Sequence, residues 1–240
     1  MYIGKELLNP KNDYVFKRIF GHKGNEEITK QMLSSIMKRE IKNITLSENT
    51  ILEKDLQGDK IGIVDIHAKI EEETEVDIEM QVIDEKNIEK RIMYYWSLLY
   101  TKGIQQGAPF YKLHKTIGIL IADFKIENLR KIEKYCTKWQ IREEEHTSVI
   151  LTDILELYII ELPKARENKK KDKETMPWIK FLENPKEMEM EEMSEENKVA
   201  IKKAKEVLEE ISEDEHERYI AYLRDKAIRD EKSIEAYGYD

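Results

Sequence analysis

Two acidic side chains and one amide lie on neighbouring segments of the chain that the sequence predicts to be strands. Asp65 belongs to the first segment, and Glu79 and Gln81 belong to the second. If both carboxylates lie on one face, they repel each other unless solvent screens them or a cation lies between them. Two carboxylates with water molecules are the usual ligands of Mg²⁺, and Gln81 could orient a water beside the ion. The residue types therefore indicate a metal site with Asp65 and Glu79 as its ligands.

The two segments alternate between apolar and polar residues with a period of two. The even positions Val64, Ile66, Ala68 and Ile70 of the first segment and Val76, Ile78, Met80 and Val82 of the second are apolar, and the linker Glu71–Glu75 is short and polar. This pattern is typical of an antiparallel hairpin with one face on the core. The odd-numbered residues, Asp65 and Glu79 among them, then share the other face.

The length of the hairpin loop decides which residues face each other. Because both apolar sets have even numbers, the loop must contain an odd number of residues. A three-residue loop, Glu71–Glu73, places Asp65 opposite Glu79, whereas a five-residue loop places Asp65 opposite Gln81 with Glu79 on the diagonal. In both registers the two carboxylates lie within about 4.5–8 Å of each other at Cβ.

The simpler alternative is that this face is an ordinary solvated surface. Lys60 and Lys69 could neutralise its acids, and His67, on the same face, is then a surface histidine of a strand. The pattern alone leaves both interpretations open.

Periodicity and capping residues predict the elements that would position the hairpin. A basic stretch, Lys164–Lys173, is predicted to be an exposed loop. The predicted helices are one entered at Asn9–Asp13 and ended by Gly21–Asn25, then Glu26–Lys38, Asn87–Gly107, one capped by Ser194 and reaching Ile211, and Glu213–Ile234. The predicted strands outside the hairpin are Lys115–Ala122, Ser148–Leu151 and Leu157–Glu161, with strand or irregular structure at Ile44–Leu56.

The overall composition excludes several classes of protein. The single cysteine excludes an internal disulfide and a cysteine-rich zinc cluster, and it indicates a reducing compartment. No apolar run approaches the ~20 residues that a membrane helix needs, so we expect a cytoplasmic protein without a membrane partner. The sequence lacks the motifs of serine hydrolases, P-loop proteins and dinucleotide-binding proteins.

Charge divides the chain into two parts. The whole chain has 41 Lys and Arg against 50 Asp and Glu, which gives a net charge of −9. Residues 1–173 contain 30 of each kind, so the entire acidic excess lies in residues 174–240. We therefore predict a first domain over residues 1–173 and an acidic helical region over residues 174–240. The acidic region would repel a polyanion, so we expect it to form a homo-oligomer or to cover the face of the first domain.

The order of several short motifs resembles a known family. The arrangement D-x13-E-x-Q on a hairpin followed by a helix resembles the PD-(D/E)xK nuclease core in its E-x-Q form. The surrounding motifs resemble the Rpn-type recombination-promoting nuclease and transposase family over nearly the whole chain. These motifs are NDYVFKRIFG (Asn12–Gly21), DKIGIVDIHA (Asp59–Ala68), IEMQ (Ile78–Gln81), KRIMYYWSLLY (Lys90–Tyr100) and ERYIAYLRDKAIRD (Glu217–Asp230).

The resemblance implies an α/β fold, with a restriction-endonuclease-like core of a mixed central sheet flanked by helices and a C-terminal helical extension. It implies a DNA endonuclease that hydrolyses phosphodiester bonds with Mg²⁺, for which Mn²⁺ is a substitute. Asp65 and Glu79 would bind the metal with the backbone carbonyl of Met80, and Gln81 stands where many such enzymes have lysine. Glutamine can only hydrogen-bond, so more of the charge stabilisation falls to the metal. Asp13 could assist the metal, although we favour a helix N-terminal charge.

Two further features leave alternatives. Arg91, on the helix after the hairpin, could pair with a phosphate or with an acid. Tyr95 and Trp96, on the same helix, are expected to be core residues rather than ligands of DNA. The competing function is a catalytically inactive DNA-binding or protein-interaction module that retains the nuclease fold.

Overall fold

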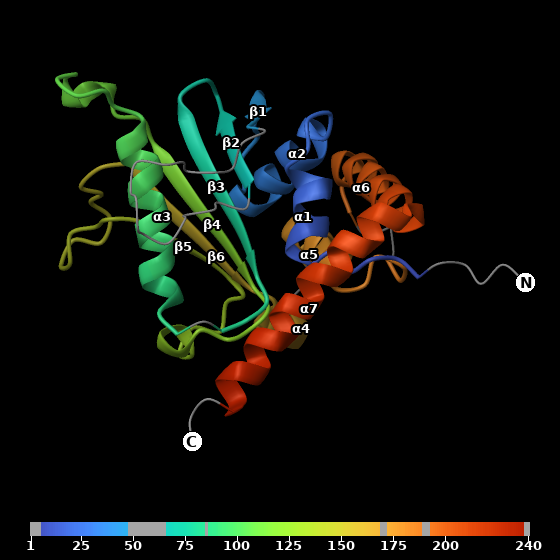
Figure 1. The fold of residues 1–240 in the computed structure, drawn as a ribbon. Helices are drawn as coiled ribbons and strands as arrows, with labels where there is room; N and C mark the ends of the chain where they lie inside the picture. The colour runs from blue at the N-terminus through green and yellow to red at the C-terminus, as the bar shows by residue number, and fades with distance from the viewer. Residues whose placement is uncertain (1–5, 48–65, 85, 169–171, 189–192, 238–240) are drawn as a thin grey trace, which may run out of the picture.

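The structure is a computed structural model, and it describes residues 6–47, 66–84, 86–168, 172–188 and 193–237 (Figure 1). Within these residues, six strands form one mixed sheet in the order β1-β2-β3-β4-β6-β5. The pairs β3–β4 and β4–β6 are parallel, and the remaining pairs are antiparallel. The strands are β1 (Ile44–Leu46), β2 (Ile66–Ile70), β3 (Thr74–Gln81), β4 (Thr116–Ala122), β5 (Cys136–Trp139) and β6 (Leu155–Glu161).

Helices cover both faces of the sheet, as the sequence predicts for this fold class (Figure 1). One face packs against α1, α2, α5 and α6, and the other face packs against α3. The helices are α1 (Asp13–Phe20), α2 (Glu26–Met37), α3 (Ile88–Lys102), α4 (Leu162–Glu167), α5 (Thr175–Glu183), α6 (Glu195–Glu213) and α7 (Glu215–Tyr237), with short 3₁₀ helices η1 (Phe110–Lys112) and η2 (Glu127–Leu129).

The hairpin of β2 and β3 has the three-residue loop. Ile66 pairs with Ile78, and Ile70 pairs with Thr74, so residues 71–73 form the loop. Even-numbered side chains such as Ile66 and Ile78 are buried in the larger core, as the alternation predicts. Because β2 begins at Ile66, the predicted ligand Asp65 and the predicted strand residues from Lys60 lie outside the described residues.

The larger core joins the N-terminal and C-terminal helices. Phe20 of α1 makes edge-on contacts with Trp178 and Phe181 of α5, at ring-centroid distances of 6.0 and 6.1 Å. Ile201 and Leu208 of α6 are both 0% exposed in the same cluster. Helices α5 and α6, although they belong to residues 174–240, therefore share one hydrophobic core with α1, α2 and the sheet.

Helix α3 approaches the other face of the sheet closely at Gly118. A Cβ atom built on Gly118 would lie 2.8 Å from Leu157 Cδ2 and 3.5 Å from Ile92 Cγ1. Trp96 anchors the same helix by donating a hydrogen bond of 2.9 Å from Nε1 to the carbonyl of Thr116. The absence of a side chain at Gly118 thus leaves room for Leu157 of β6 beneath α3, which lies over β3 and β4.

The structure corrects three expectations about elements. The helix predicted to reach Gly107 ends at Lys102, with Gly103 as its C-cap, because the next residues form an exposed turn. Ser148–Leu151 forms no strand, and only an isolated bridge links Ile150 to Arg142. The predicted loop Lys164–Lys173 begins inside α4, where Lys164 is buried against Glu161.

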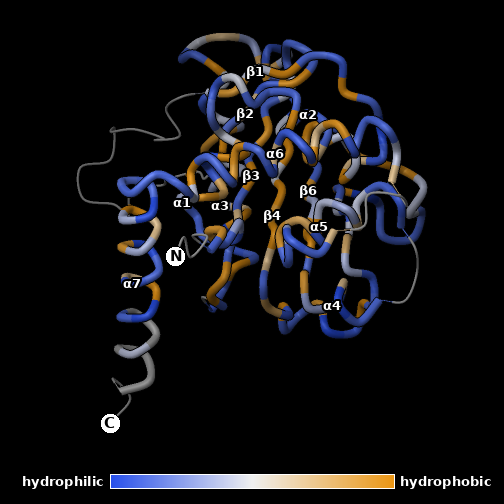
Figure 2. The backbone as a smooth tube through the Cα atoms, turned by 90° about the vertical axis from the view of Figure 1, so that its right-hand side faces the viewer, coloured by the Kyte–Doolittle hydropathy of each residue, from blue (hydrophilic) through white to orange (hydrophobic). Residues whose placement is uncertain are grey.

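Helix α7 is joined to α1 by polar contacts over its first half. The Asn12 amide donates to the carbonyl of Ala221 at 3.0 Å and to Asp225 Oδ1 at 2.7 Å. The Tyr14 hydroxyl donates to Glu217 at 2.8 Å; burial, and then this hydrogen bond, raise the pKa of Tyr14 to about 12. The second half of α7 extends away from the body of the molecule (Figure 2). No helix of the described residues has the length and apolarity to cross a membrane.

Candidate active site

Glu79 lies in the middle of β3, between the paired strands β2 and β4. Its register partner in β4 is Leu120, and its side chain is 2% exposed, as is that of Asp77 on the same face. A buried carboxylate is costly unless cations or hydrogen-bond donors compensate for its lost hydration. The interpretation of this face as a solvated surface is therefore wrong at Asp77 and Glu79.

Arg91 approaches Glu79 from α3. Its Nε atom lies 4.0 Å from Glu79 Oε2, and its guanidinium lies 5.4 Å from the centre of the Tyr95 ring. Ile88 and Ile92 hold this part of α3 against the sheet, so Arg91 lies at the edge of the buried stripe. The sequence left a phosphate or an acid as the partner of Arg91, and the structure places the acid Glu79 close to it.

Gln81 is the last residue of β3 and lies on the same face as Glu79, roughly 7 Å further along the strand. Its side chain is half-buried, and its backbone carbonyl accepts a hydrogen bond of 2.9 Å from the amide of Asp123. Asp65, the other predicted site residue, lies outside the described residues and is therefore not placed. Among the residues that the structure describes, no group of three His, Cys, Asp or Glu side chains could by itself hold a metal ion.

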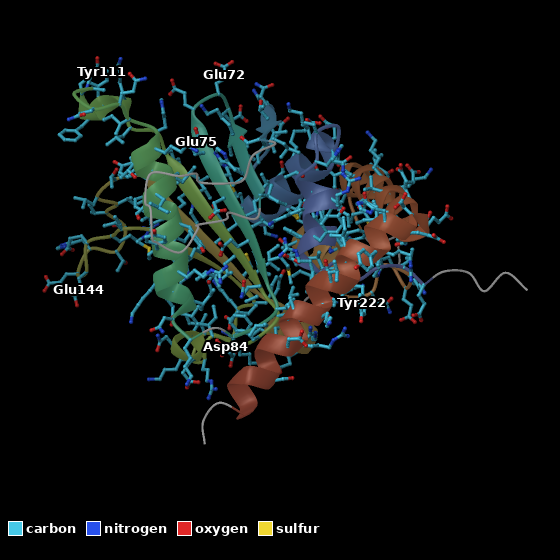
Figure 3. All side chains as sticks on the ribbon, in the orientation of Figure 1. Glu72, Glu75, Asp84, Tyr111, Glu144 and Tyr222 are labelled. Carbon is cyan, nitrogen blue, oxygen red and sulfur yellow. The ribbon has the colours of Figure 1, made fainter. Side chains whose placement is uncertain are left out.

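Lys69 and His67 compensate a different acid, near the hairpin loop (Figure 3 labels Glu75). His67 Nε2 lies 2.6 Å from Glu75 Oε2, and Lys69 Nζ lies 3.2 Å from Glu75 Oε1. Burial raises the pKa of Glu75, but the hydrogen bonds from His67 and Lys69 outweigh it, so this pKa lies below its usual value. The predicted neutralisation by Lys69 therefore occurs at Glu75, four residues before Glu79.

A charged cluster that the sequence analysis missed lies beyond the carboxyl end of β4. Asp123 contacts Arg166 and lies 2.7 Å from Lys11, and Arg166 lies 2.8 Å from Glu183. The signal was the acidic residue that directly follows the buried run Thr116–Ala122, since loops at the carboxyl ends of parallel strands often carry functional groups. Because Asp123 also bonds to the Gln81 carbonyl, the cluster fixes the end of β3.

Asp13 lies in the first turn of α1, where a negative charge meets the helix dipole. Its Oδ2 atom is 3.7 Å from Arg224 Nε of α7. This position agrees with the favoured interpretation of Asp13 as a helix N-terminal charge.

A family model described as PD-(D/E)XK nuclease family transposase matches residues 10–238. The chain belongs to this family. Its mixed six-stranded sheet flanked by helices agrees with a PD-(D/E)XK fold. Searches of curated proteins and of solved structures gave no match. Its family indicates a function like that of a nuclease or transposase. The hairpin of β2 and β3 is the segment in which the sequence predicts the acidic residues of a nuclease site.

Proposed function

We propose that this PD-(D/E)XK family member is a DNA endonuclease that hydrolyses phosphodiester bonds with Mg²⁺. Asp65 and Glu79 would hold the metal, and Gln81 would orient the attacking water. Family membership and the buried carboxylate of Glu79 support this assignment.

The observation that carries the proposal is the register of the hairpin. Its pairs run from Ile70 with Thr74 to Ile66 with Ile78, and each step adds one residue on each strand. One more step in the same register would bring Asp65 opposite Glu79, at a Cβ separation of about 4.5–5.5 Å. Two carboxylates at this distance suit one divalent cation.

The donor set of the site fits Mg²⁺ or Mn²⁺. It would consist of the carboxylate oxygens of Asp65 and Glu79 with water molecules, and hard oxygen ligands suit these ions. His67 is engaged with Glu75, and Cys136 lies on a different strand. When bound, the metal would supply an activated water and charge neutralisation on the phosphate. Arg91, near Glu79, would neutralise a further phosphate oxygen.

The first test measures nicking of supercoiled plasmid in Mg²⁺ by Asp65→Asn and Glu79→Gln variants. We expect each to lose at least about 100-fold in rate, because each removes a negatively charged ligand. Glu75→Gln is the matched control: it makes a carboxylate-to-amide change on the same face of β3, where Glu75 is held by His67 and Lys69. If Glu79→Gln nicks as fast as the unaltered protein, the assignment is wrong.

A second readout does not require cleavage. A metal that binds the folded state alone raises the melting temperature, by an amount that increases with the logarithm of its concentration above the dissociation constant. We expect Mg²⁺, Mn²⁺ and Ca²⁺ to raise the melting temperature of the unaltered protein and of Glu75→Gln, but not that of Glu79→Gln.

The approach of Arg91 also favours the second candidate function, an inactive DNA-binding module. A guanidinium 4.0 Å from Glu79 could compensate this carboxylate without a metal. Such a module would bind DNA with no nicking in Mg²⁺ or Mn²⁺ and no metal-dependent rise in melting temperature. The two experiments above therefore separate the two candidates.

A further inference from the structure

One long segment of this acidic chain has no acidic residue. Residues 90–122 contain no Asp or Glu, although the whole chain has 50 in 240 residues. The same 33 residues contain Lys90, Arg91, Lys102, Lys112 and Lys115, and they include most of α3 and the turn that follows it. A protein of net charge −9 thus presents a local positive segment, which attracts polyanions.

The turn after α3 exposes two aromatic rings. We call residues 103–113, which include η1, the arm. Phe110 and Tyr111 at its tip are each 84% exposed, and Tyr111 lies at the far end of the arm in Figure 3. Such exposed rings contribute little to the core, and they commonly mark a binding surface. The adjacent Lys112 is also exposed.

The outer face of α3 connects the arm to the candidate active site. Arg91 lies near Glu79 at one end of this helix, and Lys102 is exposed at the other end. They are eleven positions apart along the helix, a length of about 16 Å. Between them, on nearly the same side of the helix, Tyr94 is 43% exposed.

Two acidic groups of neighbouring elements lie near this positive segment. Glu73 of the hairpin loop lies 4.0 Å from His114, which follows the arm at its base. Glu89 at the start of α3 bonds with Asn128. Glu89 therefore lies at the end of α3 opposite the arm, whereas Glu73 lies near the base of the arm.

We propose that the arm and the outer face of α3 bind an unpaired DNA strand that leads from the active site. Phe110 and Tyr111 stack on unpaired bases, and Lys102 and Lys112 contact the backbone phosphates. Exposed aromatic rings between lysines are the arrangement that binds single strands without reading their sequence. This inference rests on the proposed function for its choice of DNA, and it adds a preference for single-stranded or locally unpaired substrate.

The test measures binding rather than cleavage. Fluorescence anisotropy with Ca²⁺ in place of Mg²⁺ gives the affinity of the full chain for a labelled single strand and for the same sequence as a blunt duplex. We expect the double variant Phe110→Ala/Tyr111→Ala to bind the single strand about tenfold or more weakly, with a much smaller change for the duplex. The matched control, Tyr219→Ala/Tyr222→Ala, removes two rings of 59% and 54% exposure on α7 and should bind as the unaltered protein does.

Salt dependence separates the roles of rings and lysines. The aromatic variant should keep the slope of log affinity against log salt, because stacking releases no counterions. Lys102→Gln/Lys112→Gln should reduce the slope for a single strand by about 1.4, the contribution of two phosphate contacts.

Three outcomes would overturn the inference: no single-strand binding by the unaltered protein, equal binding by the aromatic variant, or an equal loss in the α7 control. If the aromatic variant lost binding to phosphatidylcholine–phosphatidylglycerol vesicles but bound DNA as the unaltered protein does, the arm would instead be assigned to a membrane surface. The nicking assay with Glu79→Gln does not depend on these binding measurements. Failure of the endonuclease assignment can therefore be distinguished from failure of the proposed single-strand binding by the arm and α3.

Discussion

At the scale of single residues, the approach of Arg91 to Glu79 joins a cation and a candidate metal ligand. Nε and Oε2 are 4.0 Å apart, and Arg91 is 29% exposed while Glu79 is 2% exposed. A metal ion at Glu79 and a phosphate at Arg91 would each replace part of this attraction. The attraction between the two side chains can therefore stabilise the fold before substrate binds. When substrate and metal bind, Glu79 becomes available to the metal and Arg91 to the phosphate.

Replacing Arg91 with alanine should make the protein depend more strongly on metal. Without metal, we expect Arg91→Ala to lower the free energy of unfolding by about 1 kcal/mol or more, because Glu79 loses a nearby cation. Added Mg²⁺ should then raise the melting temperature of the variant more than that of the unaltered protein. The control is Arg130→Ala, which removes a surface ion pair with Glu127 and should cost less than about 0.5 kcal/mol. An equal response to Mg²⁺ in all three proteins would contradict the coupling.

Asp172 should make stability depend on acid pH. Burial opposes its ionisation, but hydrogen bonds from Lys38, Tyr135 and two backbone amides lower the pKa of Asp172 to about 2. Its ionised form thus stabilises the fold above pH ~4, the ordinary pKa, and this contribution is lost as the pH falls towards 2.

Urea unfolding of Asp172→Asn at several pH values tests this expectation. At pH above 4 the variant should be less stable by about 1 kcal/mol, a modest value because the side chain is partly solvated. The difference should shrink as the pH falls through the window below 4. Asp153→Asn, at an exposed position, should show no such trend, and a difference independent of pH would refute the role of Asp172.

At the scale of elements, a buried ion pair joins β6 to α4. Lys164 Nζ lies 2.5 Å from Glu161 Oε2 and donates to the Leu129 carbonyl at 2.8 Å, while Glu161 accepts from the Ile126 amide. Their side chains are only 6% and 1% exposed. This network connects the end of β6 to the loop after β4.

Replacing Lys164 with methionine should therefore be strongly destabilising. We expect a loss of about 3–5 kcal/mol in the free energy of unfolding, because Glu161 would stay buried without its cation. The double variant Glu161→Gln/Lys164→Met should recover part of this loss in urea unfolding. A single variant as stable as the unaltered protein would show that the pair contributes little.

The sequence predicted elements wherever local periodicity and burial agreed. The hairpin, the buried strand β4 and the Ser194-capped helix α6 were predicted because their apolar residues repeat at strand or helix spacing. Lys164 was mispredicted because a run of basic residues resembles a loop, and its partner Glu161 ends a different element. Strand β5 was missed because its four residues do not alternate, with only Thr137 buried.

The candidate site was predictable only in part. Strand parity placed Glu79 and Gln81 on one face. Arg91 reaches Glu79 because α3 crosses from β3 to β4 and lies over both, a tertiary arrangement that spacing along the chain does not contain. The burial of Asp77 and Glu79 has the same origin, since α3 and not solvent covers that face.

At the scale of the whole molecule, charge is distributed by face. The acidic helix α6 packs on the side of the sheet opposite α3, whereas the acid-free segment 90–122 includes most of α3 (Figure 1). A polyanion would therefore approach from the α3 side, and repulsion by α6 would act least there.

Two truncations should separate the structural and accessory parts of residues 174–240. Ending the chain after Asp225 keeps the contacts of Asn12 and Tyr14 with α7, so we expect little change in melting temperature. Ending it after Lys186 removes Ile201 and Leu208 from the core, so we expect an unfolded protein. Circular dichroism measures both results, and a folded shorter variant would contradict this division.

Sedimentation tests the predicted homo-oligomer through the C-terminal helices. Tyr222 and Leu223 of α7 are 54% and 44% exposed, which leaves apolar surface available for a second copy. The full chain should sediment as a larger species than the variant Tyr222→Ser/Leu223→Ser, which removes this apolar surface. Equal sedimentation as monomers would contradict the prediction.

Gly118 bears on how sequence variants of this protein should be interpreted. A β-carbon there would meet Leu157 Cδ2 of β6 and would touch Ile92 of α3 only at an ordinary contact distance, so side chains larger than that of alanine would be needed to push α3 outward. Arg91 and the arm would move with the helix. A saturation screen that selects for DNA cleavage would therefore report position 118 as intolerant of large side chains, although it bears no reactive group. A strong loss of activity at position 118 would then identify a residue that positions α3, and not a residue that contacts the substrate or the metal.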